Sequence, residues 1–308
     1  MPPGVKSQPR VAIVTRTKNR NLMLRRALES VDAQTFTDYV HVVLNDGGDP
    51  VQLQAICDEY NREKRIVVHN EQSVGMVVAL NQAITSVESE FVAILDDDDS
   101  WLPERLSRSI EQMEQNDAAV SVVKMTVVEE QVKNGTIHRI KEYLHPQSGE
   151  GEISLYKQCH QNYLSNGVVM YKRELYNRLA GYDETLPLAE DWDFGIRLML
   201  ECDAAFLRED EPLVFYHQRP SSANDEGNSS LARVDLQEQA INVVRNKYLR
   251  ADLRRDILGV GYLMNSEESG TEMARRLEAH INYSVAPLAG SLDRIQARLD
   301  AMTSAPAL

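Results

Sequence analysis

The sequence has few cysteines, a deficit of basic residues and no long hydrophobic run. Its three cysteines, Cys57, Cys159 and Cys202, lie far apart and show none of the CxxC or Cys/His spacings of zinc sites. No stretch approaches the roughly 20 apolar residues that cross a bilayer. The first ten residues also lack the apolar centre of a secretory signal. We therefore expect reduced cysteines and a cytoplasmic protein.

Basic residues are outnumbered, with 33 Lys and Arg against 47 Asp and Glu and a formal net charge of −14. Binding to nucleic acids depends on clustered Lys and Arg that release counterions from the phosphates. We therefore expect no nucleic-acid partner. A phosphate group bound by this chain would be held locally, by a metal ion, by backbone amides or by a few placed cations.

The 308 residues are 43% hydrophobic, which is ordinary for a globular protein and sufficient for a core. From residue 10 to about 173, short β-branched runs alternate with longer amphipathic segments, as in βαβ units with a mainly parallel sheet. We predict antiparallel additions to the sheet within 118–173. The predicted strands are 11–15, 39–44, 65–69 and 91–95. The predicted helices are 21–33, 74–87, 189–202 and one that opens at Pro103.

The composition changes after residues 221–230 to charged helical sequence without strand signals. We predict a flexible N-terminus over 1–9, an α/β domain over 10–222 and an all-helical extension over 223–308. Apolar residues from Ile281 to Met302 recur at alternating spacings of four and three, as in the seam of a short coiled coil. The extension is therefore expected either to pack on its own domain or to mediate self-association.

Four aspartates, Asp96, Asp97, Asp98 and Asp99, directly follow the predicted strand 91–95. Acidic runs are usually solvated loops, but open α/β sheets bind ligands at the carboxyl ends of their strands. In an extended chain Asp96 and Asp98 would share one side, which makes Asp97 the member expected to contribute least. Crowded carboxylates raise one another's pKa unless a cation neutralises them. The run therefore suits Mg²⁺ or Mn²⁺ shared with substrate phosphate oxygens.

A second acidic pair, Glu190 and Asp191, precedes Trp192 at the start of the predicted helix 189–202. Acidic residues at a helix N-terminus interact favourably with the helix dipole, so the pair alone does not require a catalytic role. Together with the aspartate run it acquires one. Displacement of a nucleoside diphosphate from a sugar needs the acceptor hydroxyl deprotonated, and a placed carboxylate can serve as that base.

In order along the chain, these motifs resemble the inverting glycosyltransferases of family 2, which adopt the GT-A fold. The resemblance covers about residues 10–222. It implies a Rossmann-like mixed, mainly parallel sheet flanked by helices. The segments that carry it are VAIVTRTKNR, VVLNDGGD, NEQSVGMVVALNQAI, FVAILDDDDSWLPERL, NGVVMYKRELYNRLAGYDETLPLAEDWDFGIRL and LVFYHQRPSS. The chain departs from the usual family pattern at Arg16, Lys18, Asn45 and Leu80.

The resemblance also implies roles for individual residues, with Asp191 as the catalytic base. The residues implied to contact the donor are Thr15, Asn19, Arg20, Asp46, Gly75, Asn81, Asp96, Asp97 and Arg219. Those implied on the acceptor side are Asn166, Gly167, Glu190 and Trp192. The implied metal ligands are Asp96, Asp98, Asp99 and His217. His217 and Arg219 exchange the usual family order, so either His217 ligates the metal or Arg219 neutralises the diphosphate as a fixed cation.

The substrates and partners implied by the resemblance are a divalent cation, Mn²⁺ or Mg²⁺, and a nucleoside-diphosphate sugar. A UDP-sugar is favoured over dTDP- and GDP-sugars. The acceptor would be a glycan or a lipid-linked molecule in bacterial surface polysaccharide or glycoconjugate assembly. Association with the inner face of the cytoplasmic membrane, and homo-oligomers formed through the C-terminal helices, would be consistent with this role.

Two other function classes stay open. The segment ILDDDDS contains D-x-D-x-S after an apolar strand, as in phosphatases and phosphotransferases with an aspartyl nucleophile. The departures from the family pattern also allow a non-catalytic module that binds nucleotide or glycan without turnover. A dehydrogenase is disfavoured because no GxGxxG follows the first strand.

Overall fold

The computed structural model describes residues 8–149, 153–202, 207–220, 227–228 and 234–265. Most of the N-terminus predicted to be flexible and all of the predicted coiled-coil seam lie outside the described residues. The chain forms two compact units, 1–246 and 247–308. This division falls after Asn246, whereas the change in composition suggested a boundary after residue 222.

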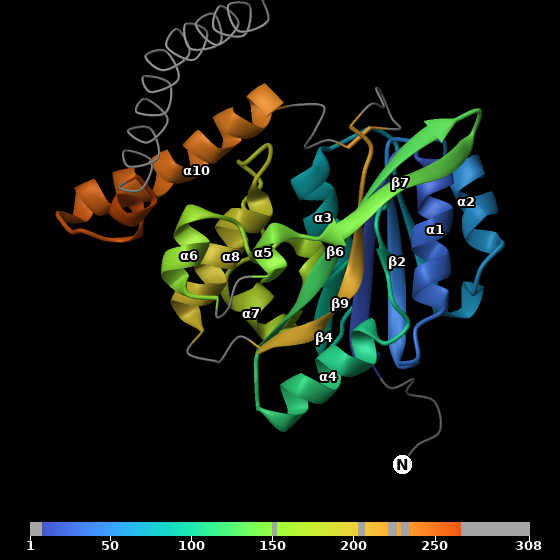
Figure 1. The fold of residues 1–308 in the computed structure, drawn as a ribbon, viewed down its shortest axis with the longest axis horizontal. Helices are drawn as coiled ribbons and strands as arrows, with labels where there is room; N and C mark the ends of the chain where they lie inside the picture. Colours follow the sequence, from blue (N-terminus) through green and yellow to red (C-terminus); the bar gives the residue numbers. More distant parts are fainter. Residues whose placement is uncertain (1–7, 150–152, 203–206, 221–226, 229–233, 266–308) are drawn as a thin grey trace, which may run out of the picture. The chain divides into compact units, whose positions relative to one another are not determined.

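The first unit contains a nine-stranded mixed sheet in the order β3-β2-β1-β4-β8-β6-β9-β5, with β7 paired to β6 (Figure 1). The strands are β1 (Val11–Thr17), β2 (Tyr39–Asp46), β3 (Arg65–Asn70), β4 (Phe91–Ile94), β5 (Ser100–Trp101), β6 (Val120–Lys133), β7 (Thr136–Leu144), β8 (Val169–Lys172) and β9 (Leu207–Gln218). The first four strands are parallel to one another, and β8 lies antiparallel to both β4 and β6. The predicted mixed sheet with antiparallel additions is confirmed.

Helices flank the sheet, as predicted. The helices include α1 (Asn21–Asp32), α2 (Pro50–Asp58), α3 (Met76–Thr85), α4 (Arg105–Gln115), α5 (Pro146–Gly149), α6 (Leu155–His160), α7 (Arg173–Arg178), α8 (Glu190–Glu201) and α10 (Val234–Arg255). Helix α2 was not predicted, although its start carries two recognisable signals. Pro50 occupies the first turn, and the Asp49 side chain accepts hydrogen bonds from the amides of Val51 and Gln52.

Apolar packing fixes the positions of the central strands. All residues of β4 and nearly all of β1 are buried. Helix α1 buries Met23, Leu24, Ala27, Leu28 and Val31, and Leu24 and Leu28 pack with residues of β2 and α2. Figure 1 shows α1 and α2 side by side along one flank of the sheet. Since close-packed strands shift little, the loops at their ends start from fixed points.

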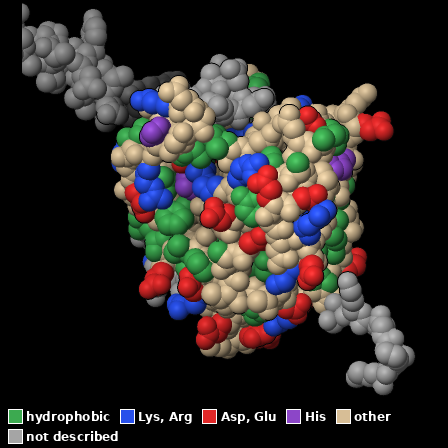
Figure 2. Space-filling view, turned by 90° about the vertical axis from the view of Figure 1, so that its right-hand side faces the viewer, with side chains coloured by type: hydrophobic (Ala, Val, Ile, Leu, Met, Phe, Trp, Pro, Cys, Tyr) green, Lys and Arg blue, Asp and Glu red, His purple; other side chains and the backbone are tan. Residues whose placement is uncertain are grey.

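The surface carries charges of both signs. On the flank of α1 and α2, acidic and basic side chains are interspersed, and no field of one sign covers that face (Figure 2). Among the helices of the described residues, none is long and apolar enough to span a membrane.

Candidate functional site

Three parallel strands end together at one edge of the sheet. Strand β1 lies between β2 and β4, and its residue Thr17 pairs with Asn45 of β2. On the other side, the amide of Leu95 donates to the carbonyl of Val14 at 3.0 Å. The residues that follow β1 and β4 are therefore brought next to each other. This edge is where ligands bind in open α/β sheets.

The aspartate run after β4 is a turn. The amide of Asp99 donates to the carbonyl of Asp96 at 3.1 Å. Arg20 then donates to both Asp97 Oδ1 and Asp98 Oδ2, each at 2.8 Å. The predicted alternation along an extended chain is wrong, because the turn directs these two neighbouring carboxylates to one guanidinium.

Asp97, predicted to contribute least, is firmly held. It also accepts a hydrogen bond from the Thr17 hydroxyl at 2.6 Å. Burial raises the pKa of Asp97 to about 6, raises the pKa of Asp96, and raises that of Asp99 well above its ordinary value. The neighbouring carboxylates add to the effect of burial in all three cases. The positive charges of the neighbouring arginines lower these pKa values but do not fully offset burial and the repulsion among the carboxylates.

A second group of charged residues packs behind the run, and we call it the Glu130 network. Glu130, on β6, is 1% exposed. It accepts hydrogen bonds from Arg26 of α1 at 2.8 and 3.1 Å and from Arg219 at 2.7 Å. Burial favours a higher pKa for Glu130, but the hydrogen bonds from His217 and Arg26 outweigh it and lower the pKa to about 2. Glu130 thus remains ionised and orients two arginines.

His217 belongs to the Glu130 network. Its Nδ1 lies 3.0 Å from Glu130 Oε2, and its Nε2 lies 2.9 Å from the Ser100 hydroxyl. Its backbone amide donates to Asp99 Oδ1 at 3.0 Å. Burial lowers the pKa of His217, so the ring is neutral at pH 7. With both ring nitrogens engaged by protein groups, this geometry does not match the metal ligand expected from the sequence.

Arg219, the alternative to His217, does reach the aspartate run. Its Nη2 donates to Asp98 Oδ2, and its backbone amide donates to the Asn228 side chain at 2.7 Å. Asn228 in turn donates to the same Asp98 oxygen at 3.1 Å. Gly227, beside it, accepts a hydrogen bond from Arg20 at 2.9 Å. Residues beyond the predicted boundary at 222 therefore take part in the site.

The acidic pair at the start of α8 faces the aspartate run across one arginine. Arg16 Nη2 lies 3.0 Å from Glu190 Oε1 and 3.8 Å from Asp96 Oδ1. Burial and the adjacent Glu190 raise the pKa of Asp191 to about 7, and Asp96 contributes in the same direction. Ala189, before the pair, has a left-handed backbone with φ of 60°. The donor and acceptor sides predicted from the sequence thus meet at Arg16.

Several predicted site residues have internal partners instead. Thr15 is fully buried and contacts His41 at 3.0 Å. Asn81 lies within α3 and binds Tyr182 and its neighbours rather than the strand ends. Trp192 is buried and donates from its ring nitrogen to a backbone carbonyl at 2.6 Å. These three side chains have structural roles in this arrangement.

Asp46, Asn19 and Gly75 form the loops around the expected nucleoside position. Asp46 accepts hydrogen bonds from Ser73 and from the amides of Val74 and Gly75. Burial favours a higher pKa for Asp46, but these hydrogen bonds outweigh it and lower the pKa. Asn19 accepts from a backbone amide of the loop after β2 at 3.0 Å. Asp46 and Asn19 therefore shape the loops, and any ligand contact would come in addition.

Asn166 and Gly167 lie close to the aspartate run. A side-chain carbon added at Gly167 would stand 3.9 Å from Asp99 Oδ2. Asn166 is buried and accepts a hydrogen bond from the Tyr182 hydroxyl at 2.9 Å. The structure thus brings this predicted acceptor-side turn next to the donor-side carboxylates.

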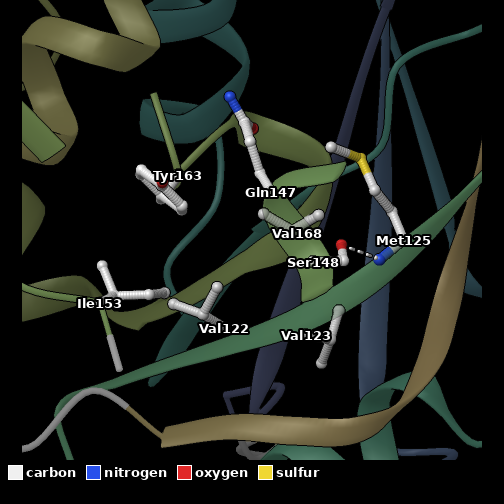
Figure 3. Close-up of a pocket in the computed structure, with 8 residues that line it drawn as sticks. All are labelled: Val122, Val123, Met125, Gln147, Ser148, Ile153, Tyr163 and Val168. Atoms are coloured by element: carbon white, nitrogen blue, oxygen red, sulfur yellow. Dashed lines mark hydrogen bonds between the residues drawn. The ribbon is translucent and has the colours of Figure 1, made fainter. Parts of the chain in front are cut away.

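The apolar pocket drawn in Figure 3 is separate from these residues. It is lined by Val122, Val123, Met125, Gln147, Ser148, Ile153, Tyr163 and Val168. None of the predicted site residues lines it, and the Ser148 hydroxyl oxygen already accepts a hydrogen bond from the Met125 amide at 3.0 Å. We therefore assign this pocket to the packing of β6 and not to the site.

The aspartate run fits a divalent cation shared with a phosphate ligand. Asp96 is the most open of the four, with its side chain 35% exposed, and carboxylate oxygens suit Mg²⁺ and Mn²⁺. Within the part of the chain that the structure describes, no group of three or more acidic, His or Cys side chains is arranged to hold an ion. The protein would thus supply one or two carboxylates, as is usual for Mg²⁺ bound with substrate phosphates.

The residues that the sequence predictions missed are Arg16, Thr17, Arg26, Glu130 and Asn228. Arg16 was noted only as a departure from the family pattern. Its position at the end of a predicted strand could have identified it as a site residue. Glu130 sits in a strand among valines, and a charged residue in such a place is a sign of a buried ion pair. The other three became visible only through their partners.

Comparison with known proteins points to one family. The family model described as glycosyl transferase family 2 matches residues 12–180, which is more than half of the chain. An uncharacterized glycosyltransferase of Methanocaldococcus jannaschii is 30% identical over 198 residues, covering 63% of this chain and 66% of the relative. The O-antigen biosynthesis glycosyltransferase WbnJ of Escherichia coli is 26% identical over 178 residues, covering 57% and 66%. The chain thus spans about two thirds of the length of these relatives.

Solved structures agree in fold. The S. aureus TarS fragment 1-349 in complex with UDP-GlcNAc has a TM-score of 0.60 at 20% identity, covering 78% of this chain and 66% of that one. The mannosyltransferase PcManGT from Pyrobaculum calidifontis, in complex with GDP-Man and Mn²⁺, has a TM-score of 0.58 at 16% identity, covering 92% and 81%. This likeness confirms the predicted GT-A type of fold. Since the family model matches more than half of the chain, the chain belongs to glycosyl transferase family 2.

Proposed function

We propose that this glycosyltransferase moves a sugar from a nucleoside-diphosphate sugar to an acceptor hydroxyl with inversion at the anomeric carbon. The proposal rests on the observation that one arginine contacts two groups of carboxylates. Arg16 contacts Asp96 on the side of the aspartate run and Glu190 beside Asp191. A leaving diphosphate and an attacking hydroxyl need such different partners within one site.

On the donor side, the proposed role of Arg20 and Arg219 is to bind the diphosphate. Both arginines already contact Asp98, and Glu130 orients Arg219 from behind. Planar guanidinium groups match phosphate oxygens in pairs. Asp96 and Asp98 would hold Mn²⁺ or Mg²⁺, and the bound cation would supply positive charge to the departing diphosphate.

On the acceptor side, Asp191 is the proposed base. As the acceptor oxygen bonds to the anomeric carbon, its proton passes to Asp191. The bond from that carbon to the diphosphate breaks, and its electron pair leaves with the diphosphate. The best catalytic pKa lies near the working pH, and the pKa of Asp191 of about 7 meets this condition. A single displacement of this kind inverts the anomeric centre.

The proposed donor is a UDP-sugar, with dTDP- and GDP-sugars as the alternatives. TarS binds UDP-GlcNAc and PcManGT binds GDP-Man with Mn²⁺, which supports a nucleotide-sugar and a divalent cation in general. The name of WbnJ supports a glycan or lipid-linked acceptor in surface polysaccharide assembly. Work at the inner face of the cytoplasmic membrane, and oligomers formed through the C-terminal helices, belong to the same proposal.

The proposal is tested by release of nucleoside diphosphate from UDP-, dTDP- and GDP-sugars, with Mn²⁺ and after chelation. We expect one donor class to release nucleoside diphosphate. This release should require the metal and should be lost in Asp191→Asn. Asp58→Asn, which changes an acidic residue of α2 away from the strand ends, serves as the matched control. The product's anomeric configuration, read by NMR, tests inversion.

Other outcomes point to other functions. Binding without release from any donor would favour a non-catalytic module. A covalent phosphoenzyme on Asp96 would favour the aspartyl-nucleophile class. Release that persists after chelation would contradict the role of the metal.

A further inference from the structure

Arg16 is a charged, partly exposed residue near the end of β1, a strand that is otherwise buried. Its side chain is 15% exposed and lies where β1 reaches the carboxyl edge of the sheet. Nη1 donates to the carbonyl of Met76, the first residue of α3, at 2.9 Å. Nη2 lies 3.0 Å from Glu190 Oε1 and 3.8 Å from Asp96 Oδ1. One guanidinium therefore joins β1, the start of α3, the aspartate run and the start of α8.

Arg16 supplies positive charge to the acidic pair at the start of α8. Glu190 is 4% exposed, and Asp191 follows it directly in the chain. Neighbouring carboxylates repel, and the loss of Arg16 would leave the buried Glu190 without its ion-pair partner. The left-handed backbone of Ala189 adds local strain that persists only while the surrounding contacts hold it.

We propose that Arg16 is a positioning residue that locks the start of α8 against the donor end of β1 and keeps Asp191 ready to accept a proton. This inference rests on the proposed function, because it concerns the base of that reaction. Arg16 touches Glu190 and acts on Asp191 through the field of its charge and through the placement of α8.

The groups that face Asp191 show why one cation has this effect. Glu190 on its own helix and Asp96 at the end of β4 disfavour its ionised form, while Arg16 on β1 favours it. The Trp192 amide donates to Asp191 Oδ1 at 2.8 Å, and this hydrogen bond also favours the ionised form. Tyr182 lies near enough for Asp191 to raise its pKa, and it is neutral at the working pH. Arg16 is the cation among these neighbours.

The first test measures kcat against pH for four variants. Arg16→Gln is expected to move the acid limb of the profile upward by about one pH unit, because Arg16 favours the ionised form of Asp191 and a nearby opposite charge lowers a carboxyl pKa by about 1–3 units. Arg16→Lys should keep the limb near its original pH while kcat falls, because an ammonium keeps the charge but lacks the planar fork. In Arg16→Gln/Glu190→Gln the limb should return toward the parent value, since the charge that Arg16 balances is removed as well.

Arg10→Gln is the matched control for the loss of an ion-paired arginine. Arg10 precedes the same strand at the opposite edge of the sheet and pairs with Glu90 and Glu114, each at 2.8 Å. Its profile should not move. If Arg16→Gln lowered kcat equally at every pH, Arg16 would be a structural residue only, and the inference would be overturned.

A second test needs no turnover and separates this inference from the proposed function. Urea unfolding of metal-free protein at pH 5 and pH 8 compares Arg16→Gln with the double variant. The loss of stability in Arg16→Gln should be larger at pH 8, above the pKa of Asp191, and should largely vanish in the double variant. An equal loss at both pH values would refute the electrostatic link. Absence of sugar transfer by the parent protein would instead count against the proposed function alone.

Discussion

Asp191→Asn is predicted to do two opposite things, lowering turnover and raising stability above neutral pH. Turnover should fall about 10²- to 10⁴-fold, the usual contribution of a placed base. The stability effect follows from the pKa of Asp191, which burial and Glu190 raise from 3.8 to about 7. The folded protein therefore prefers the protonated carboxyl, and the unfolded chain does not.

The sign and window follow from the two pKa values. Below about pH 4 the carboxyl is protonated in both the folded and the unfolded state, so its ionisation does not change the free energy of unfolding. As the pH rises from about 4 to 7, the unfolded chain loses its proton first, so stability declines, and above pH 7 the penalty is complete. Each pKa unit corresponds to about 1.4 kcal/mol, which sets an upper limit of about 4 kcal/mol for Asp191. Asparagine removes the charge and with it this penalty.

The assay is urea unfolding of parent and variant in a chelating buffer at pH 4.5, 6 and 8. We expect the variant to gain between about 1 and 4 kcal/mol at pH 8 and little at pH 4.5. The amide side chain introduced by the substitution keeps an oxygen that can accept from the Trp192 amide, so the start of α8 should be kept. A variant that is less stable at pH 8, or equally affected at all three values, would refute the reasoning.

Three further predictions concern the donor side and its loops. Glu130→Ala should lower the free energy of unfolding by about 3–5 kcal/mol, because buried arginines lose their carboxylate, as measured by urea unfolding. Gly47→Ala should cost clearly more than Gly135→Ala in thermal unfolding. Both glycines have positive φ, which costs about 1 kcal/mol, but only at Gly47 would the added carbon meet Ser73, 2.5 Å from its amide nitrogen. Asp98→Asn should abolish the Mn²⁺-dependent rise in melting temperature that a nucleoside diphosphate gives to the parent, and an unchanged rise would remove Asp98 from the site.

Much of the fold follows from local patterns. The β-branched runs at 11–15, 39–44, 65–69 and 91–95 predicted strands that the structure contains, because a short apolar run and the stiffness of β-branched residues act within a few residues. Helix α2 was not predicted, although Asp49 and Pro50 are typical of a helix N-terminus. Gly47 and Gly48 precede these residues, and paired glycines are typical of a turn.

The sequence also predicted a site formed by the end of β4 and the start of α8, and Arg16 contacts both segments in the structure. A strand that runs into acidic residues places them at the ligand-binding edge of a parallel sheet wherever the rest of the chain lies. The conformation of the aspartate run did not follow. Arg20 donates hydrogen bonds to two neighbouring carboxylates of the run. The conformation of the run therefore depends on a residue nearly 80 positions away.

What the sequence determined by itself was therefore the family of fold and the identity of the acidic residues, since both depend on local pattern. Only the tertiary structure decided their partners. It placed Glu130 beside Arg219, 89 residues later, and it set Arg16 between Asp96 and Glu190. Ion pairs of this kind form between segments that meet only when the sheet is assembled, and no periodicity within one segment encodes them.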